Sequence, residues 1–246
     1  MSHTTRILVT LCTYNERENL AQLIPEIHQH VPEADILVVD DNSPDGTGDF
    51  VDELAADDGR IHAIHRAGKL GLGTATVAAF QWGIQREYDW LVNLDADFSH
   101  PPAVIPSLLR ETDHADVVIA SRYVAGGGIE GWGWHRKVMS RGINVFARTI
   151  LGLRTRDNSG SFRCYRVATL AKVDWSGSRA KGFAILEEIL FRLKQAGARF
   201  AEVPYVFEER RFGESKISWK EATGAINVLL RLRFAGPLTE SAHKKA

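Results

Sequence analysis

The feature that most constrains the fold is an alternation of short apolar runs with longer segments of helical periodicity through the first half of the chain. The apolar runs, rich in Val, Ile and Leu, predict strands at residues 6–12, 35–40, 61–65, 90–94 and 116–121. The segments between them predict helices at 18–30, 46–56, 74–85 and 103–113. Because a helix between two strands brings the second strand back in the same direction, the pattern predicts an α/β fold with a single mostly parallel sheet flanked by helices.

The second half of the chain has a different pattern. A glycine-rich stretch at 126–128 is followed by a basic amphipathic segment at 135–151. The remaining elements are predicted to be a strand at 162–165, a helix at 186–195, a strand pair at 200–207 and a helix at 219–234. We find no internal repeat and no low-complexity linker, so we expect residues 1–246 to form one domain with a polar tail at 237–246.

The charge is unevenly distributed, although the net charge is -1. Residues 31–60 hold ten acidic side chains and one basic one, whereas residues 135–156 hold six basic side chains and no acidic one. The first segment is typical of solvated helix faces with a carboxylate site, and the second of a surface that meets an anion.

The cysteines and the apolar runs limit the cellular context. Cys12 and Cys164 have neither a paired nor a metal-ligand spacing, which predicts two free thiols and a reducing compartment. The first residues are polar, and no stretch approaches the roughly 20 apolar residues of a membrane span. We therefore expect neither a signal peptide nor a spanning anchor.

Two motifs follow the first two predicted strands, where ligands bind in parallel sheets because loops and helix N-termini converge there. TYNERENL at 13–20 can be a helix start capped by Asn15, or part of a ligand site. VVDDNSPDGT at 38–47 places paired carboxylates on a rigid edge, where a nucleotide ribose or base finds hydrogen-bond acceptors. Asp41 is predicted to contact the nucleotide, with Asp40 as the residue that braces the loop.

The third motif, GKLGLGTA at 68–75, matches neither the dinucleotide-binding fingerprint nor the P-loop pattern. Its glycines predict close approach of the backbone to a diphosphate, with Lys69 adding a point charge.

The fourth motif is LDADFSH at 94–100, which follows a buried strand. Residues two apart on an extended segment point the same way, so Asp95 and Asp97 are predicted to face one ligand. Oxygen ligands favour a hard divalent cation, Mg²⁺ or Mn²⁺, that bridges these carboxylates and a diphosphate. The alternative is a helix N-cap supplied by Asp97 or Ser99.

Taken in order, the motifs resemble the dolichyl-phosphate mannosyltransferase (polyprenol monophosphomannose synthase) family of inverting glycosyltransferases, which belong to family 2 and have the GT-A fold. The resemblance covers residues 7–234, through TYNERENL, VVDDNSPDGT, KLGLGTA, DADFSH, SRY, GWGWHRKVMSRG, GSFRCYR and FGESK. It implies a nucleotide-binding half at about 5–123 and an acceptor and membrane-facing half at about 124–236.

The resemblance also assigns residues. It implies that the donor is bound by Tyr14, Glu16, Val39, Asp41, Asp95 and Ala96, to which the third motif adds Lys69. The metal is expected on Asp97, with Asp95 and Ser99 beside it. Donor or acceptor phosphates are expected on Arg122, Arg210 and Lys216, and the lipid phosphate on Arg122, Arg136 and Ser140. The sequence departs from the family pattern at Cys12, where many members have proline, at Ser99, where some have a metal-binding glutamine, and at Leu186, where a glutamine usually precedes the glutamate that is Glu188 here.

The implied reaction moves mannose from GDP-mannose to dolichyl or another polyprenyl phosphate with inversion, and it needs a divalent metal. A phosphate acceptor with a second pKa near 6 is largely ionised at neutral pH, so no general base is required. The alternatives are a UDP-glucose-dependent polyprenyl-phosphate glucosyltransferase and a non-catalytic subunit of a membrane transferase complex. No nucleic acid is expected among the partners.

The chain is expected to work at the cytoplasmic face of a membrane without crossing it, through 135–151 and 219–234. In the first segment, apolar area is supplied by Val138, Ile143, Val145, Phe146 and Ile150, and positive charge by Arg136, Lys137, Arg141 and Arg148. The alternative is that the apolar positions pack onto the sheet. A membrane-embedded partner subunit is a further expectation.

Overall fold

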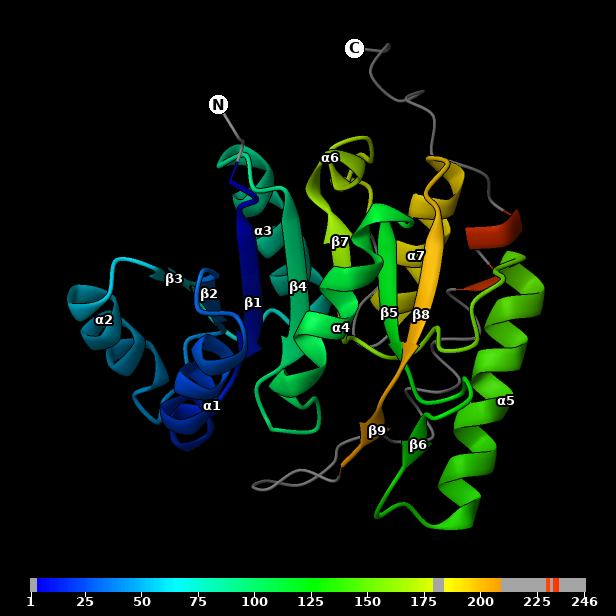
Figure 1. Ribbon diagram of the computed structural model, residues 1–246, viewed down its shortest axis with the longest axis horizontal. Helices are drawn as coiled ribbons and strands as arrows, with labels where there is room; N and C mark the ends of the chain where they lie inside the picture. The colour runs from blue at the N-terminus through cyan, green and yellow to red at the C-terminus, as the bar shows by residue number, and fades with distance from the viewer. Residues whose placement is uncertain (1–3, 179–183, 209–228, 231, 235–246) are drawn as a thin grey trace, which may run out of the picture.

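The computed structural model describes residues 4–178, 184–208, 229–230 and 232–234. Its centre is a seven-stranded sheet with the order β3-β2-β1-β4-β7-β5-β8 (Figure 1). The strands are β1 (Ile7–Thr13), β2 (Asp35–Asp40), β3 (Ile61–His65), β4 (Trp90–Asp95), β5 (Val117–Ser121), β7 (Arg163–Arg166) and β8 (Phe200–Pro204). All neighbouring pairs are parallel except those that β7 makes with β4 and β5. The predicted mostly parallel sheet is confirmed.

Helices cover both faces of this sheet. They are α1 (Arg17–His30), α2 (Thr47–Asp57), α3 (Leu72–Gln85), α4 (Ile105–Arg110), α5 (Trp134–Leu151), α6 (Val167–Leu170) and α7 (Ile185–Gln195), with the 3₁₀ turns η1 (Pro102–Val104) and η2 (Glu111–Asp113). In Figure 1, α1 and α4 lie in front of the sheet and α3 and α7 behind it, and α5 runs beside the β8 end.

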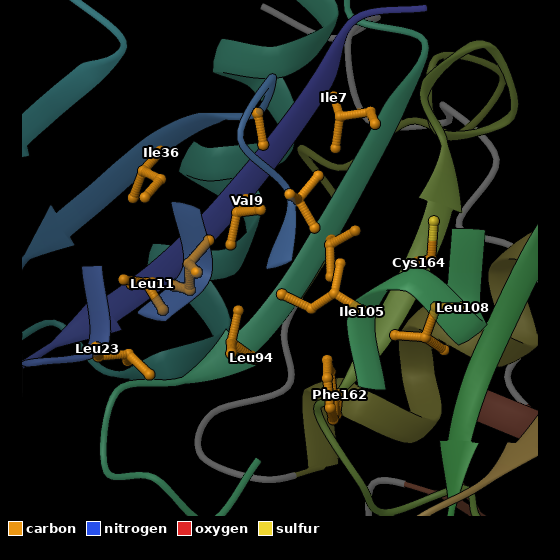
Figure 2. Close-up of a cluster of buried hydrophobic side chains, with 14 of the residues drawn as sticks. Ile7, Val9, Leu11, Leu23, Ile36, Leu94, Ile105, Leu108, Phe162 and Cys164 are labelled. Carbon is orange, nitrogen blue, oxygen red and sulfur yellow. The ribbon is translucent and has the colours of Figure 1, made fainter. Parts of the chain in front are cut away.

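Two apolar cores hold these layers together. The first packs α1 and α4 against one face of the sheet, through residues such as Leu23, Ile105 and Val9 (Figure 2). The second packs α3, α5 and α7 against the other face, where Phe80, Leu151 and Ile189 meet Leu8 and Leu91. Because successive strand residues point to opposite faces and both faces are covered, the central strands are mainly apolar; the buried polar pair Thr10 and Asn93 is joined by a hydrogen bond of 3.1 Å.

The sequence predicted most element boundaries within a residue or two, with two differences. The helix predicted at 103–113 is divided into η1, α4 and η2, and it begins with Pro102, whose fixed φ suits a first helical position. The strand pair predicted at 200–207 does not form a hairpin. Instead, β8 pairs with β5, and β9 (Val206–Phe207) pairs with β6 (Gly128–Ile129) in a separate two-stranded sheet.

Two further predictions concern the cysteines and the last helix. Cys12 and Cys164 are both free thiols, as expected, with Cys164 buried and Cys12 half-buried. Most of the helix predicted at 219–234 lies outside the described residues, and the five described positions, 229–230 and 232–234, are helical.

Candidate active site

The carboxyl ends of β1, β2, β4 and β5 meet at one edge of the sheet. These strands run in one direction, because β1 is parallel to β2 and β4, and because β4 and β5 are both antiparallel to β7. Their last residues are Thr13, Asp40, Asp95 and Ser121. The loops that follow carry most of the predicted site residues, so the sheet gathers side chains that are far apart in the sequence.

Asp40 braces the loop after β2, as one of the two alternatives for this motif predicted. Its Oδ1 accepts hydrogen bonds from the hydroxyls of Thr13 (2.9 Å) and Ser43 (2.5 Å). Its Oδ2 accepts a third from the backbone N–H of Ser43 at 2.9 Å. The carboxylate is 3% exposed, so it ties the ends of β1 and β2 together and offers almost no surface to a ligand.

Asp41 instead joins the β2 loop to the glycine-rich loop before α3. Its Oδ1 pairs with the Arg66 guanidinium, and its Oδ2 accepts a hydrogen bond from the Gly71 N–H at 3.0 Å. Gly71 has a φ of +93°, which side-chain-bearing residues rarely adopt, so the turn into α3 requires glycine. Asp41 and Arg66 thus form a fixed acceptor and donor at this end of the site. No sequence motif points to Arg66.

Tyr14 and Lys69, two of the predicted donor-contact residues, meet across the two loops. The Lys69 ammonium lies 3.8 Å from the centroid of the Tyr14 ring, within cation–π range. Glu16 sits beside them at the start of α1, and its carboxylate accepts a hydrogen bond from the Asn19 side chain at 2.6 Å. Asn15 does not cap this helix, because Glu16 occupies the cap position and Asn15 has a φ of +63°.

Two more of the predicted donor-contact residues, Val39 and Ala96, have buried side chains. Val39 is 0% exposed and packs in the second core, and Ala96 is 3% exposed and packs in the first. Each lies within or next to a strand at a position that faces a covering helix layer. Neither side chain has surface to offer a nucleotide, so a donor contact at these positions would use the backbone, and the assignment from the resemblance stays a prediction.

Asp95 ends β4 and is positioned by two neighbours. Its Oδ1 accepts a hydrogen bond from the Ser161 hydroxyl at 2.8 Å, and its backbone N–H donates to Nδ1 of His100 at 2.9 Å. Burial lowers the pKa of His100, which is stacked on Phe162, so the ring is neutral with its proton on Nε2. The Asp95 side chain remains 33% exposed and faces the site edge.

Asp97 lies in a tight turn and not on an extended segment, so the assumption that Asp95 and Asp97 alternate as in a strand is wrong. Its Oδ1 accepts hydrogen bonds from the Ser99 N–H (3.1 Å) and the Ser99 hydroxyl (2.6 Å). Phe98, between them, has a φ of +62°. The N-cap alternative is also wrong, because η1 is preceded by Pro101 and has no side-chain cap.

The chemistry of this turn suits a hard divalent cation. Asp95, Asp97 and Ser99 offer carboxylate and hydroxyl oxygens, which Mg²⁺ and Mn²⁺ prefer over nitrogen or sulfur. Within the described residues, no group of three or more His, Cys, Asp or Glu side chains could enclose a metal ion. A cation held by Asp95, Asp97 and Ser99 would leave coordination positions for oxygens of the substrate or water, which is how Mg²⁺ is usually bound beside phosphates.

Arg122, after β5, is held from behind by a buried carboxylate. Its Nε and Nη2 each donate to Asp157 at 2.7 Å, and its Nη2 also donates to Ser159 at 3.1 Å. Asp157 is completely buried, and although burial alone raises the pKa of a carboxyl, Arg122 holds it below its usual value. Nη1 of Arg122 makes no hydrogen bond to any described residue, and the side chain is 6% exposed.

Trp132 links Arg122 to the other predicted phosphate-binding residues. The Cζ of Arg136 lies 3.8 Å from the centroid of the Trp132 ring, and the Cζ of Arg122 lies 5.8 Å from it. Ser140, one helical turn beyond Arg136 on α5, meets the hydroxyl of Tyr123 at 2.7 Å. The predicted set of Arg122, Arg136 and Ser140 is therefore brought together.

An aromatic cluster separates this cationic group from the carboxylate turn. Phe207 lies 5.1 Å from Trp132 and 6.3 Å from His100, measured between ring centroids. His100 holds the backbone of Asp95, and Arg122 lies 5.8 Å from the Phe207 centroid. The rings of Trp132, Phe207 and His100 therefore lie between the arginines and the carboxylate turn.

The predicted apolar face of α5 divides between two environments. Phe146 and Ile150 pack against the second core, because they lie beside the buried residues Ala147 and Leu151. Val138 and Val145 are 61% and 56% exposed. The exposed stripe also includes Trp134, which is 68% exposed and was not in the predicted set. No helix among the described residues has the length and apolarity to cross a bilayer.

Two predicted residues, Arg210 and Lys216, lie outside the described residues. The structure adds Arg66, Trp132 and Asp157, which sequence reasoning did not assign to the site. The repeated tryptophans of the GWGW segment were a signal for Trp132, whereas the Arg122–Asp157 pair joins residues whose proximity only the fold reveals.

Comparisons with known proteins agree with this geometry. The family model described as "Glycosyl transferase family 2" matches residues 8–174. The chain is 45% identical over 213 residues to an undecaprenyl-phosphate mannosyltransferase of Micrococcus luteus, covering 87% of this chain and 88% of that protein. It is also 45% identical over 217 residues to a polyprenol monophosphomannose synthase of Mycolicibacterium smegmatis, covering 87% and 82%.

Solved structures show the same fold at low sequence identity. A mannosyl-3-phosphoglycerate synthase from Rubrobacter xylanophilus matches with a TM-score of 0.69 and 18% identity over 98% of this chain and 79% of that one. A glucosyl-3-phosphoglycerate synthase from Mycobacterium tuberculosis, in complex with Mn²⁺ and UDP-glucose, matches with a TM-score of 0.63 and 18% identity over 95% and 80%. The matched family region, the extended identity to two mannosyltransferases and the shared architecture establish that this chain belongs to glycosyl transferase family 2, with the GT-A fold.

Proposed function

We propose that this enzyme transfers mannose from GDP-mannose to the phosphate of a polyprenol, with inversion at the anomeric carbon and a divalent cation, Mg²⁺ or Mn²⁺, at the carboxylate turn. The observation that carries the proposal is that Arg122 and Arg136 both lie near the Trp132 ring, while the turn of Asp95 and Asp97 offers carboxylates beyond the adjacent aromatic cluster. The two relatives with 45% identity are named for mannosyl transfer to a polyprenyl carrier, which supports the same acceptor class.

The residues that follow β1, β2 and β4 would bind the donor. Tyr14 and Lys69 line one side of this half, about 5–123, and Asp41 with Arg66 lines another. Asp97, Asp95 and Ser99 would hold the cation, which would supply positive charge beside the donor diphosphate. Donor and acceptor are both anionic, so the main task of the site is to hold two mutually repelling groups in line.

The acceptor belongs to the half at about 124–236. Arg122, braced by Asp157, and Arg136 would hold the acceptor phosphate, with Ser140 beside them. An oxygen of that phosphate attacks the anomeric carbon while the bond from that carbon to the donor diphosphate breaks, so GDP leaves and configuration inverts. The nucleophile is already ionised at neutral pH, so no side chain has to remove a proton. Arg210 and Lys216 remain proposals for further phosphate contacts.

The acceptor also implies a membrane surface. We place the enzyme at the cytoplasmic face, with the exposed stripe of α5, Trp134, Val138 and Val145, toward the lipid. A membrane-embedded partner subunit is compatible with this placement.

The test uses the purified full chain with a polyprenyl phosphate in detergent, with GDP-mannose or UDP-glucose as donor, and with Mg²⁺, Mn²⁺ or a chelator. We expect a β-linked mannosyl lipid from GDP-mannose that disappears with the chelator, and tighter binding of GDP than of UDP in calorimetric titrations. Faster transfer from UDP-glucose would replace the donor assignment. Absence of transfer and of donor hydrolysis under all conditions would favour a non-catalytic subunit.

A further inference from the structure

A second cationic site lies one turn farther along α5, outside the residues assigned to the reaction. A cavity of about 180 Å³ is lined by Tyr123, Arg141, Asn144, Val145, Arg148 and Arg156. We call it the tri-arginine pocket. A single water takes up about 30 Å³ of liquid, so the cavity has room for a group larger than one water.

The pocket is strongly positive. Arg141, Arg148 and Arg156 line it, and none of the six lining residues is acidic. Among the described residues, none of these three guanidinium groups is within ion-pair distance of a carboxylate. The nearby Glu202 carboxylate is already engaged, since it accepts the backbone N–H groups of Arg156 and Asp157 at 2.9 and 3.1 Å. Three like charges at one cavity repel each other until an anion enters.

The walls of the pocket are fixed by hydrogen bonds. Asn144, on the buried side of α5, accepts the Asn158 N–H at 2.6 Å and donates to Ser159 at 3.0 Å. This holds the loop that carries Arg156 against the helix, and Glu202 holds the same loop from the other side. Because both walls are anchored, the backbone positions from which the arginines extend are fixed before a ligand arrives.

The pocket is continuous with the exposed apolar stripe of α5. Trp134, Val138, Arg141, Val145 and Arg148 recur at spacings of four and three residues, which places them on one face of the helix. Val145 belongs both to the stripe and to the pocket lining. A soluble anion gains nothing from this apolar stripe, whereas a lipid headgroup is presented with apolar chains beneath it.

We propose that the tri-arginine pocket binds the phosphate of an anionic membrane phospholipid, next to and distinct from the site of the acceptor phosphate. Tyr123 separates the two, because it lines the pocket while its hydroxyl meets Ser140 on the acceptor side. The inference rests on the proposed work at a membrane surface. Its role is to fix the rotational position of α5 on the bilayer, so that the acceptor site opens toward the lipid.

The test compares two double variants of the full chain that lose the same charge. The pocket variant is Arg148→Gln with Arg156→Gln, and the control is Lys137→Gln with Arg154→Gln, which changes the same helix and the same loop outside the pocket lining. Binding is measured by flotation with vesicles of phosphatidylcholine alone, with added phosphatidylglycerol, or with cholesteryl hemisuccinate, a carboxylate lipid, at matched surface charge.

We expect the pocket variant to lose roughly tenfold or more of its binding to phosphatidylglycerol vesicles, and several times more than the control. On the carboxylate vesicles the two variants should behave alike. Equal losses on phosphatidylglycerol would show diffuse attraction and overturn the proposal. The proposal would also be overturned if soluble glycerol phosphate stabilised the wild-type chain and not the pocket variant. The ligand of the pocket would then be a free phosphate ester.

Mannosyl transfer in detergent separates this inference from the proposed function. Detergent supplies no phospholipid surface, so the pocket variant should transfer mannose to a polyprenyl phosphate there at the rate of the wild type. If the wild type transferred no mannose in detergent, the proposed reaction would be contradicted. The vesicle flotation would still test whether the tri-arginine pocket binds phospholipid.

Discussion

The carboxylate edge and helix α5 differ in how their charges are satisfied. At the edge, Asp40, Asp41 and Asp97 already accept hydrogen bonds from their own or adjacent loops. On α5, Arg141 and Arg148 have no ion pair within the described residues and stand in solvent. The edge is thus organised before any ligand arrives, whereas α5 carries charge that an external anion must neutralise. The carboxylate edge therefore keeps its geometry without a ligand.

The largest effect is expected when a buried charge loses its ion-pair partner. In Asp157→Asn, Arg122 loses its buried counter-ion, and we expect the unfolding free energy to fall by about 3–5 kcal/mol in urea titrations. The control is Asp58→Asn, whose pair with Arg60 is exposed and should contribute less than about 1 kcal/mol. Similar losses in the two variants would mean that the buried pair is not the support of Arg122.

Asp97→Asn tests whether the carboxylate turn acts in the reaction and not only in the fold. We expect kcat to fall roughly a hundredfold or more, because an electrostatic group at the reacting phosphates is lost. The control, Asp113→Asn in the exposed η2 turn, should keep full activity. Unchanged turnover with unchanged metal dependence in Asp97→Asn would defeat the metal assignment.

Glu187 on α7 is a buried carboxyl group that differs from both regions, because one of its oxygens has no hydrogen-bond partner among the described residues. Its Oε2 has no hydrogen-bond partner among the described residues, and burial raises its pKa to about 7. The folded protein therefore keeps this proton where the unfolded chain loses it, so the stability from Glu187 is full below about pH 4.3 and is lost as the pH rises through 7.

The expected consequence is a change in the pH dependence of unfolding. Relative to the wild type, Glu187→Gln should gain about 3 kcal/mol of unfolding free energy between pH 4.5 and pH 8, because its amide cannot ionise. The measurement is urea unfolding across this range. Parallel curves for the two proteins would show that Glu187 is ionised in the folded state.

The smallest expected effect concerns the Trp132 ring, which lies near both Arg122 and Arg136. Trp132→Leu keeps an apolar side chain but removes the ring face that Arg136 covers, so we expect the KM for the polyprenyl phosphate to rise about fivefold with little change in kcat. Trp82→Leu is the matched control. The Cζ of Arg86 lies 4.0 Å from the centroid of the Trp82 ring, and this pair lies away from the site. A fall in kcat alone would place Trp132 at the reacting atoms.

Sequence patterns predicted the fold well and the site unevenly. The apolar runs from 6–12 to 116–121 recovered the parallel strands, because burial on both faces leaves a strong signal. The roles that the motifs gave to Asp97, Arg122, Arg136 and Val39 stay predictions. The motifs did not point to Asp157, whose partner Arg122 is 35 residues away in the chain. Contacts made by folding, such as Asp41 with Arg66, leave no local pattern.

The two cysteines have a practical consequence for the α5 experiments. Burial raises the pKa of the Cys12 thiol to about 12 and raises that of Cys164 as well, so neither forms an appreciable amount of thiolate at neutral pH. Thiol-reactive reagents need the thiolate, so the native side chains should stay unmodified in the folded protein. A single cysteine introduced at the exposed Thr149 could then carry a fluorophore without removal of the native thiols, and its emission would report directly when this helix meets lipid.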